Sequence, residues 1–178
     1  MNILITIIIV LGSLVALFLI IALLTKKECR IEKQTVINKS KQEVFNYLKL
    51  LKNQEKYSVW VMKDPNINLV YTGTDGTVGA TSAWTSNDKN VGIGAQEIIK
   101  LNDGESIDVE IRFEKPFKAT NYANTTVTTV GDGQTKVSHV FTGKAKFPMN
   151  IMNLFMDKLV GRDMQKNLDN VKANLENN

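Results

Sequence analysis

Residues Ser106–Lys115 read SIDVEIRFEK, and this segment indicates what kind of sheet the chain forms. Every second side chain is apolar and those between are charged, the two sets being Ile107, Val109, Ile111, Phe113 and Asp108, Glu110, Arg112, Glu114. Strict alternation is typical of a β-strand with one buried and one solvated face, as antiparallel sheets have. We therefore expect the core to form on one face of an antiparallel sheet.

Six further strands are expected around this one. They are predicted at residues 30–37, 67–72, 78–85, 91–101, 119–130 and 135–146. The sequences between them are rich in Gly, Asn and Asp, as in Asn102-Asp103-Gly104 and Gly131-Asp132-Gly133, and such sequences form tight turns. Short links join antiparallel neighbours, so a curved seven-stranded antiparallel sheet is predicted.

Helical periodicity occurs on both sides of the strands. Ser40 and Glu43 have the spacing of a capping box, and the apolar pattern after them predicts a helix from residue 41 to about residue 52. Residues 53–60 are expected to form a short second helix or a turn. From residue 149 or 150 to about residue 175, apolar residues recur with the helical period, which predicts one long amphipathic helix in the hollow of the sheet. The expected fold class is α+β.

The chain begins with an uncharged apolar run of 22 residues, Ile3–Leu24. A helix of that length measures about 33 Å and matches a bilayer core of about 30 Å, so a single transmembrane crossing is predicted. A cleaved signal peptide needs a basic start and a small-residue cleavage site, and the sequence has neither. The basic residues that follow the run are Lys26, Lys27, Arg30 and Lys33. By the positive-inside rule they predict that the following domain faces the cytoplasm.

Residues 1–28 are thus assigned to an anchor with its basic flank, and residues 29–178 to a soluble unit of single-domain size. The formal net charge of +4 is small and spread along the chain, which argues against nucleic-acid binding. The only cysteine, Cys29, excludes a disulfide framework, and the only histidine, His139, leaves no metal-ligand spacing. We expect no metal and no cofactor, and we predict the bilayer and a hydrophobic small molecule as partners.

Short motifs in the soluble part match a known superfamily. They are Val36-Ile37-Asn38-Lys39-Ser40, Glu43-Val44-Phe45, Trp60, Tyr71-Thr72-Gly73, Gly76-Thr77-Val78-Gly79-Ala80, Val91-Gly92, Gly94, Gln96, Lys136-Val137 and Phe147-Pro148-Met149-Asn150. With this order of strands and helices, the chain resembles the SRPBCC or START-like superfamily, which includes polyketide cyclase-like proteins, lipid-transfer domains and the birch-pollen-allergen group. It is most similar to a bacterial polyketide cyclase-like branch that carries an N-terminal membrane helix. His139 departs from the pattern, since many relatives have an aromatic residue there.

The resemblance implies a helix-grip fold with a cavity between the curved sheet and the C-terminal helix, where a hydrophobic ligand binds. The candidate ligand-binding residues are Trp60, Tyr71, Trp84, His139, Phe141, Met152, Phe155, Met156 and Leu159. The same apolar residues are equally expected in a solid core, because a helix that covers a sheet is apolar whether or not a cavity exists. Lys115-Pro116-Phe117 interrupts a hairpin and is expected at the cavity mouth.

Three functions are consistent with these patterns. The leading hypothesis is a membrane-tethered domain that binds a hydrophobic or lipid-like small molecule and has no chemistry of its own. The second is a polyketide cyclase or aromatase in which His139 acts as the acid/base, although the sequence identifies no carboxylate to orient the imidazole. The third is a protein-interaction module with a filled core, which an exposed apolar patch would favour.

Overall fold

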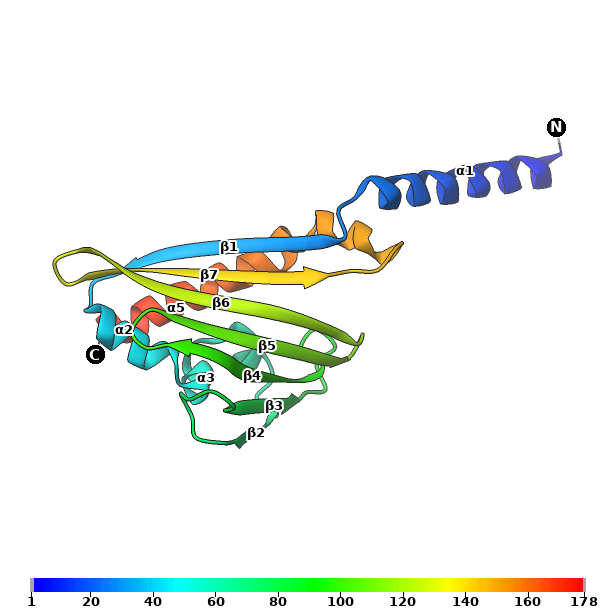
Figure 1. Cartoon of the computed structure of the whole chain (residues 1–178). Helices are drawn as coiled ribbons and strands as arrows, with labels where there is room; N and C mark the ends of the chain where they lie inside the picture. Colours follow the sequence, from blue (N-terminus) through cyan, green and yellow to red (C-terminus); the bar gives the residue numbers. More distant parts are fainter. Residues whose placement is uncertain (1, 178) are drawn as a thin grey trace.

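The computed structural model describes residues 2–177 of the chain (Figure 1). An N-terminal helix, α1 (Ile3–Leu24), precedes an α+β domain in which a seven-stranded antiparallel sheet curves around a C-terminal helix. The strands are β1 (Glu28–Ile37), β2 (Asn68–Thr72), β3 (Thr81–Thr85), β4 (Ile93–Asn102), β5 (Ser106–Lys115), β6 (Ala119–Gly131) and β7 (Gln134–Lys144). Their order in the sheet is β1-β7-β6-β5-β4-β3-β2. The predicted α+β helix-grip architecture is confirmed.

The strand predictions hold to within three residues at each end. The largest difference is at β3, which begins at Thr81 instead of residue 78. The preceding backbone forms successive turns, because Thr77 N donates to Thr74 O and Ala80 N donates to Thr77 O. Hydrogen bonds within these turns keep the segment out of the regular β-ladder.

Short helices connect β1 to β2: α2 (Lys41–Leu48), η1 (Leu51–Asn53), α3 (Gln54–Tyr57) and α4 (Val59–Lys63). The Ser40 hydroxyl accepts a hydrogen bond from Glu43 N at 3.3 Å, which confirms the predicted helix cap. The helix ends before residue 52 because the amides of Leu51 and Lys52 donate to the Asp75 carboxylate at 2.7 and 3.2 Å. These two amides bind the Asp75 side chain instead of carbonyls of α2, so α2 does not continue.

The C-terminal segment is not the single helix that the periodicity predicted. It divides into a 3₁₀ segment, η2 (Met149–Leu154), a π-helical turn, η3 (Asp157–Gly161), and the α-helix α5 (Arg162–Glu176). At η2 the Asn150 side chain bonds to the end of α1. At η3, Gly161 lies so close to β1 that an added Cβ would be 2.8 Å from Lys33 Cε. Contacts with α1 and β1 therefore replace regular helical geometry here.

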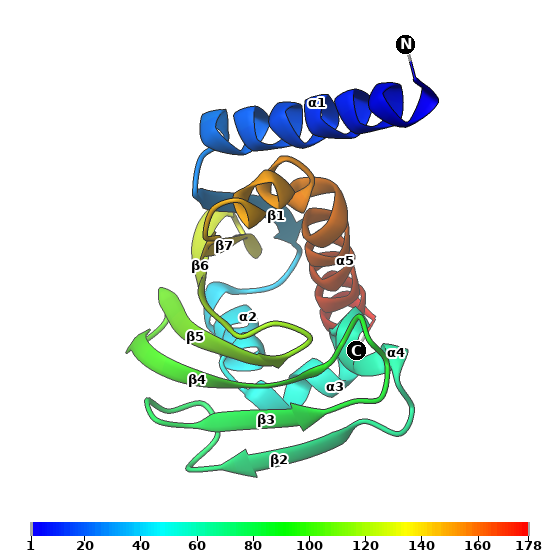
Figure 2. The same ribbon diagram turned by 90° about the vertical axis from the view of Figure 1, so that its right-hand side faces the viewer.

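The interior contains two apolar clusters along α5. The larger one joins α2 to the sheet and to the C-terminal half of α5; its buried residues are Ile37, Val44, Phe45, Leu51, Ala80, Ile98, Ile107, Val127, Val137, Leu168, Val171 and Leu175. The smaller one, nearer α1, consists of Ile31, Phe141 and Met164, with Trp60, Ile111, Met156, Val160 and Cys29 packed against it. Figure 2 shows α5 alongside the hollow of the sheet and α1 crossing beyond its end.

Candidate functional site

Helix α1 is joined to the domain by side-chain hydrogen bonds from η2. Asn150 Nδ2 donates to the carbonyl oxygens of Ala22 at 2.6 Å and of Thr25 at 2.8 Å, and Asn153 Nδ2 donates to that of Lys26 at 2.9 Å. The last carbonyls of a helix have no partner within the helix, so Asn150 caps the C-terminal end of α1, and Asn153 binds the residue that follows the cap. Asn150 is 1% exposed, which makes this a buried junction.

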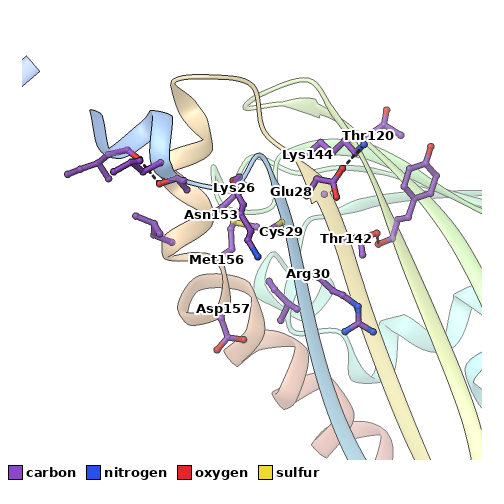
Figure 3. Close-up of a pocket in the computed structure, with 17 residues that line it drawn as sticks. Lys26, Glu28, Cys29, Arg30, Thr120, Thr142, Lys144, Asn153, Met156 and Asp157 are labelled. Carbon is purple, nitrogen blue, oxygen red and sulfur yellow. Dashed lines mark hydrogen bonds and ion pairs between the residues drawn. The ribbon is translucent and has the colours of Figure 1, made fainter. Parts of the chain in front are cut away.

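A pocket of about 1130 Å³ opens beside this junction (Figure 3). It is lined by the end of α1, by the beginning of β1 with the adjoining parts of β6 and β7, and by the turn between η2 and η3. Its apolar residues are Ile21, Leu24, Ile31, Leu154 and Met156. Small-molecule pockets commonly measure about 300–1,000 Å³, so this open pocket is large enough for a sizeable organic molecule.

The pocket follows the free edge of β1, which is the outermost strand of the sheet. Ile31 faces the interior opposite Phe141, whereas Arg30 lies on the outer face opposite Thr142. In Figure 3, Met156, from the turn between η2 and η3, lies on one side of this strand and Thr142 lies on the other. The pocket lining therefore combines an interior apolar side with an outer polar side.

Helix α5 explains why the pocket ends where it does. Farther along β1, Gln165 Nε2 donates to Gln34 O at 3.5 Å and Lys172 Nζ donates to Val36 O at 2.8 Å. These side chains cover part of the strand edge. Stable proteins commonly protect the edge strands of a sheet in this way. Neither bond reaches the first residues of β1, and the pocket occupies that part of the edge.

Charged groups surround the pocket, and most are paired. Lys144 Nζ is 2.7 Å from Glu28 Oε1 on the outer face, where both side chains are exposed. Lys33 Nζ is 2.9 Å from Asp157 Oδ1 on the C-terminal side. Lys26 also lines the pocket, and its ammonium forms no ion pair within residues 2–177. One cation at the mouth is thus available to an anionic ligand group.

Cys29 places the chain's only thiol in the pocket wall. It lies over Gly143, where an added Cβ would be 3.4 Å from Sγ. Burial raises the pKa of the Cys29 thiol. The group is therefore protonated at neutral pH and a poor nucleophile.

The structure brings one of the nine predicted ligand residues, Met156, into this pocket. Met152 on η2, Leu159 on η3 and Phe155 between them lie close by, with their side chains exposed. Phe141 is buried in the smaller cluster, and Trp60 packs against that cluster.

His139 is on the concave face of β7, and its Nδ1 is 2.7 Å from the Thr125 hydroxyl. Burial lowers the pKa of His139 to about 4. Lys33 is its register neighbour on β1, and that ammonium is bonded to Asp157. The imidazole thus has a hydroxyl partner, where a catalytic base would need a carboxylate to orient it.

Tyr71 and Trp84 lie near the opposite edge of the sheet, away from the pocket. Tyr71 donates its hydroxyl to Glu55 at 2.8 Å, and Trp84 Nε1 donates to Val91 O at 3.2 Å. The Trp84 ring packs edge to face against Phe113 with ring centroids 5.7 Å apart. These contacts account for both aromatic residues as packing and hydrogen-bonding groups.

Sequence reasoning missed the two asparagines that attach α1 and the edge residues of β1. A signal for the first was present, since Asn150 and Asn153 are the polar residues of an otherwise apolar stretch, Met149–Leu154. A polar side chain in an apolar segment usually forms a specific hydrogen bond, because burying it without one costs free energy. No comparable signal marks Arg30 or Thr142, because their place in the pocket depends on strand order.

Comparison with known proteins agrees with this architecture. Residues 28–176 match the family model described as "Polyketide cyclase / dehydrase and lipid transport". No curated protein matches the chain significantly.

Solved structures show the same fold at low sequence identity. Norcoclaurine synthase from Thalictrum flavum, in complex with dopamine and hydroxybenzaldehyde, aligns with a TM-score of 0.65 and 10% identity over 89% of this chain and 91% of that chain. The di-domain ARO/CYC StfQ from the steffimycin biosynthetic pathway aligns with a TM-score of 0.61 and 13% identity over 82% of this chain and 50% of that chain. A protein from Chromobacterium violaceum aligns with a TM-score of 0.54 and 16% identity over 81% of this chain and 94% of that chain.

Proposed function

Because the chain belongs to the polyketide cyclase/dehydrase and lipid transport family, we propose that it is a membrane-tethered protein that binds a hydrophobic, lipid-like small molecule. The proposed binding site is the pocket between α1 and the edge of β1. Helix α1 is the tether: it is long and apolar enough to cross a bilayer, and Ala22 is its buried residue. A helix whose side chains remain exposed needs an apolar solvent.

The observation that carries the proposal is the shared lining of the pocket. Ile21 and Leu24 belong to the proposed transmembrane helix, while Ile31 and Met156 belong to the domain. A molecule in the pocket therefore touches both at once, at the level where α1 leaves the bilayer. A lipid-like ligand could move between bilayer and pocket without crossing open water, which lowers the cost of exposing its apolar surface.

The chemistry of the lining favours an amphipathic ligand. Apolar side chains of Leu154, Met156 and Ile31 suit a hydrocarbon or ring portion, while Lys26 and Arg30 suit a negatively charged or polar end. Arg30 is bonded to Glu32 at 2.6 Å, so Lys26 is the cation more readily recruited. This division matches binding sites that are mostly apolar with a few polar groups for orientation.

We assign no reaction to the domain. His139 lies outside the pocket lining, and a histidine with a pKa of about 4 is a weak general base at neutral pH. The Cys29 thiol, which does line the pocket, has its pKa raised by burial. We place the domain on the cytoplasmic side, since Lys26, Lys27, Arg30 and Lys33 follow α1 directly.

Native mass spectrometry of the full chain, released from nanodiscs made with its host membrane lipids, tests the proposal. We expect a population heavier than the apoprotein by the mass of one lipid-like molecule that survives mild activation. Thr142→Trp, which puts an indole into the polar outer side of the pocket, should reduce that population. Val140→Trp should keep it, because Val140 lies two residues away on the same face of β7 and outside the lining. Equal retention by both variants would contradict the assignment of the site.

A further inference from the structure

Residues 147–159, here called the η2–η3 segment, expose an unusual number of large apolar side chains. They are Phe147, Met149, Met152, Leu154, Phe155 and Leu159, each between 43% and 59% exposed. After α1, the described chain has fourteen exposed large apolar side chains, so this short segment contains six of the fourteen. A water-soluble surface rarely concentrates apolar groups in this way without a binding partner.

The attachment of α1 fixes where this segment lies. Asn150 is hydrogen-bonded to Ala22 O, and Ala22 is two residues before the end of α1 at Leu24. At about 1.5 Å per residue, the bond lies about 3 Å inside the end of the apolar helix. Figures 1 and 2 both place the orange η2 ribbon beside this end of α1. The exposed side chains are therefore at the level of the bilayer boundary.

From this geometry we infer that the η2–η3 segment is a second membrane contact, whose apolar side chains enter the boundary between lipid headgroups and acyl chains. The inference rests on the part of the proposed function that makes α1 a membrane anchor, and it does not require a ligand in the pocket. Its irregular backbone suits that depth, since lipid-exposed irregular backbone is not found within the hydrocarbon core. Segments with one apolar and one polar face place their apolar side chains at the boundary between lipid headgroups and acyl chains.

The charges around the segment favour a bilayer that contains anionic lipids. Lys26, Lys27, Lys146 and Lys158 adjoin the η2–η3 segment or lie within it, and none of their ammonium groups forms an ion pair within the described residues. The nearby carboxylates, Glu28 and Asp157, are bonded to Lys144 and Lys33. Basic residues beside an apolar contact add attraction to anionic headgroups.

A membrane contact of the η2–η3 segment would also determine the direction in which the pocket opens. Leu154 is exposed on the η2–η3 segment and lines the pocket, and Met156 lines it two residues later. With the segment resting in the headgroup layer, the pocket mouth opens toward lipid. Membrane contact by this segment would thus add a second point of attachment to the junction that Asn150 and Asn153 form with α1, and would hold the domain in one orientation on the bilayer.

Fluorescence quenching by brominated lipids tests this inference on the full chain. A tryptophan is added by Phe155→Trp in one variant and by Val130→Trp in a control, each reconstituted in phosphatidylcholine/phosphatidylglycerol vesicles with or without dibromo-acyl lipid. Val130 is also an exposed apolar residue, and it lies at the end of β6 farthest from α1 (Figure 1). Emission from Trp60 and Trp84 is common to both variants, so their difference reports the added residue.

We expect brominated lipid to quench most of the emission added by Phe155→Trp and little of that added by Val130→Trp. Met152→Trp, also on the segment, should behave like Phe155→Trp and provides a second site if one variant folds poorly. Equal and weak quenching at residues 152, 155 and 130 would overturn the inference, whether water or a partner protein covers the segment. Lipid retention in the native mass spectrum would still stand, so failure of this contact is distinguishable from failure of the proposed function.

Discussion

Asn150 and Ala22, which are 128 positions apart in the sequence, are joined by a 2.6 Å hydrogen bond from the asparagine side chain to the last turn of α1. The same side chain also donates to Thr25 O. Both donor hydrogens of one buried amide are thus used to attach the anchor to the domain. This junction determines where the pocket and the η2–η3 segment lie relative to the membrane.

Removing this side chain should loosen the junction. Asn150→Ala leaves the Ala22 and Thr25 carbonyls without their donors, so we expect the free energy of unfolding to fall by about 1–3 kcal/mol. Urea titration of the full chain in detergent micelles measures the change. Asn124→Ala removes a single bond to Asp108 elsewhere in the sheet and should cost less. Equal losses would mean that the junction contributes no more than an ordinary side-chain bond.

His139 should make stability depend on pH in a defined window. Burial lowers the pKa of His139 in the folded protein to about 4, below the ordinary value of 6.5, so the unfolded chain binds the proton more tightly. This contribution is complete above pH 6.5 and is lost as the pH falls from 6.5 to about 4. The loss is at most about 3 kcal/mol, because one pKa unit corresponds to about 1.4 kcal/mol.

His139→Gln removes the titrating group and keeps a side chain that can bond Thr125. Urea midpoints measured at several pH values should therefore vary less between pH 6.5 and 4 in this variant than in the natural sequence. Identical pH profiles would show that the imidazole ionises as it does in the unfolded chain.

Gly94 should tolerate no side chain, because an added Cβ would lie 2.5 Å from Arg112 O and 2.5 Å from Cζ2 of Trp84. Gly94→Ala should destabilise the domain by about 1–3 kcal/mol and shift the near-UV circular dichroism of the displaced indole. Gly133→Ala is the control, since nothing lies within 4 Å of its added Cβ and only its positive φ opposes the change. An unchanged indole spectrum in Gly94→Ala would contradict the packing described for Trp84.

Cys29 is a natural probe of pocket occupancy, because its thiol lines the pocket. Burial raises the pKa of this thiol, so we expect maleimide to react with it more slowly than with a solvent-exposed cysteine such as one introduced by Thr128→Cys. Adding lipid to delipidated full chain should slow Cys29 further and leave residue 128 unaffected. Mass spectrometry of the alkylated chain gives both reaction rates. A Cys29 alkylation rate that does not change when lipid is added would indicate that the ligand binds elsewhere.

The fold was predictable because its signals are local. Alternation in residues 106–115 and the Gly- and Asp-rich turns predict strands that the structure contains, and Ser40 caps its helix as expected. The continuous C-terminal helix was wrong because helical periodicity does not register a competing bond such as the one from Asn150 to α1. Local patterns report propensity, while long-range contacts decide where a helix begins.

The candidate site was less predictable, for the same reason. Met156 was named because apolar residues of the last segment were expected to face a ligand, and it lines the pocket. Trp84 was named as an aromatic residue that either lines a cavity or fills the core, and in the structure it packs on Gly94 and Phe113. Thr142 gave no signal, since it enters the pocket only because β7 pairs with the edge strand β1.

Photo-crosslinking shows directly whether a lipid-like molecule occupies the pocket between α1 and β1. The full chain is reconstituted in vesicles that contain a diazirine-labelled phospholipid, irradiated and digested, and the labelled peptides are identified by mass spectrometry. We predict labelling of β1 near Ile31 and of the segment around Met156 in the natural sequence and in Val140→Trp, with both reduced in Thr142→Trp. Labelling confined to α1, or unchanged by Thr142→Trp, would show that no lipid-like molecule binds in this pocket.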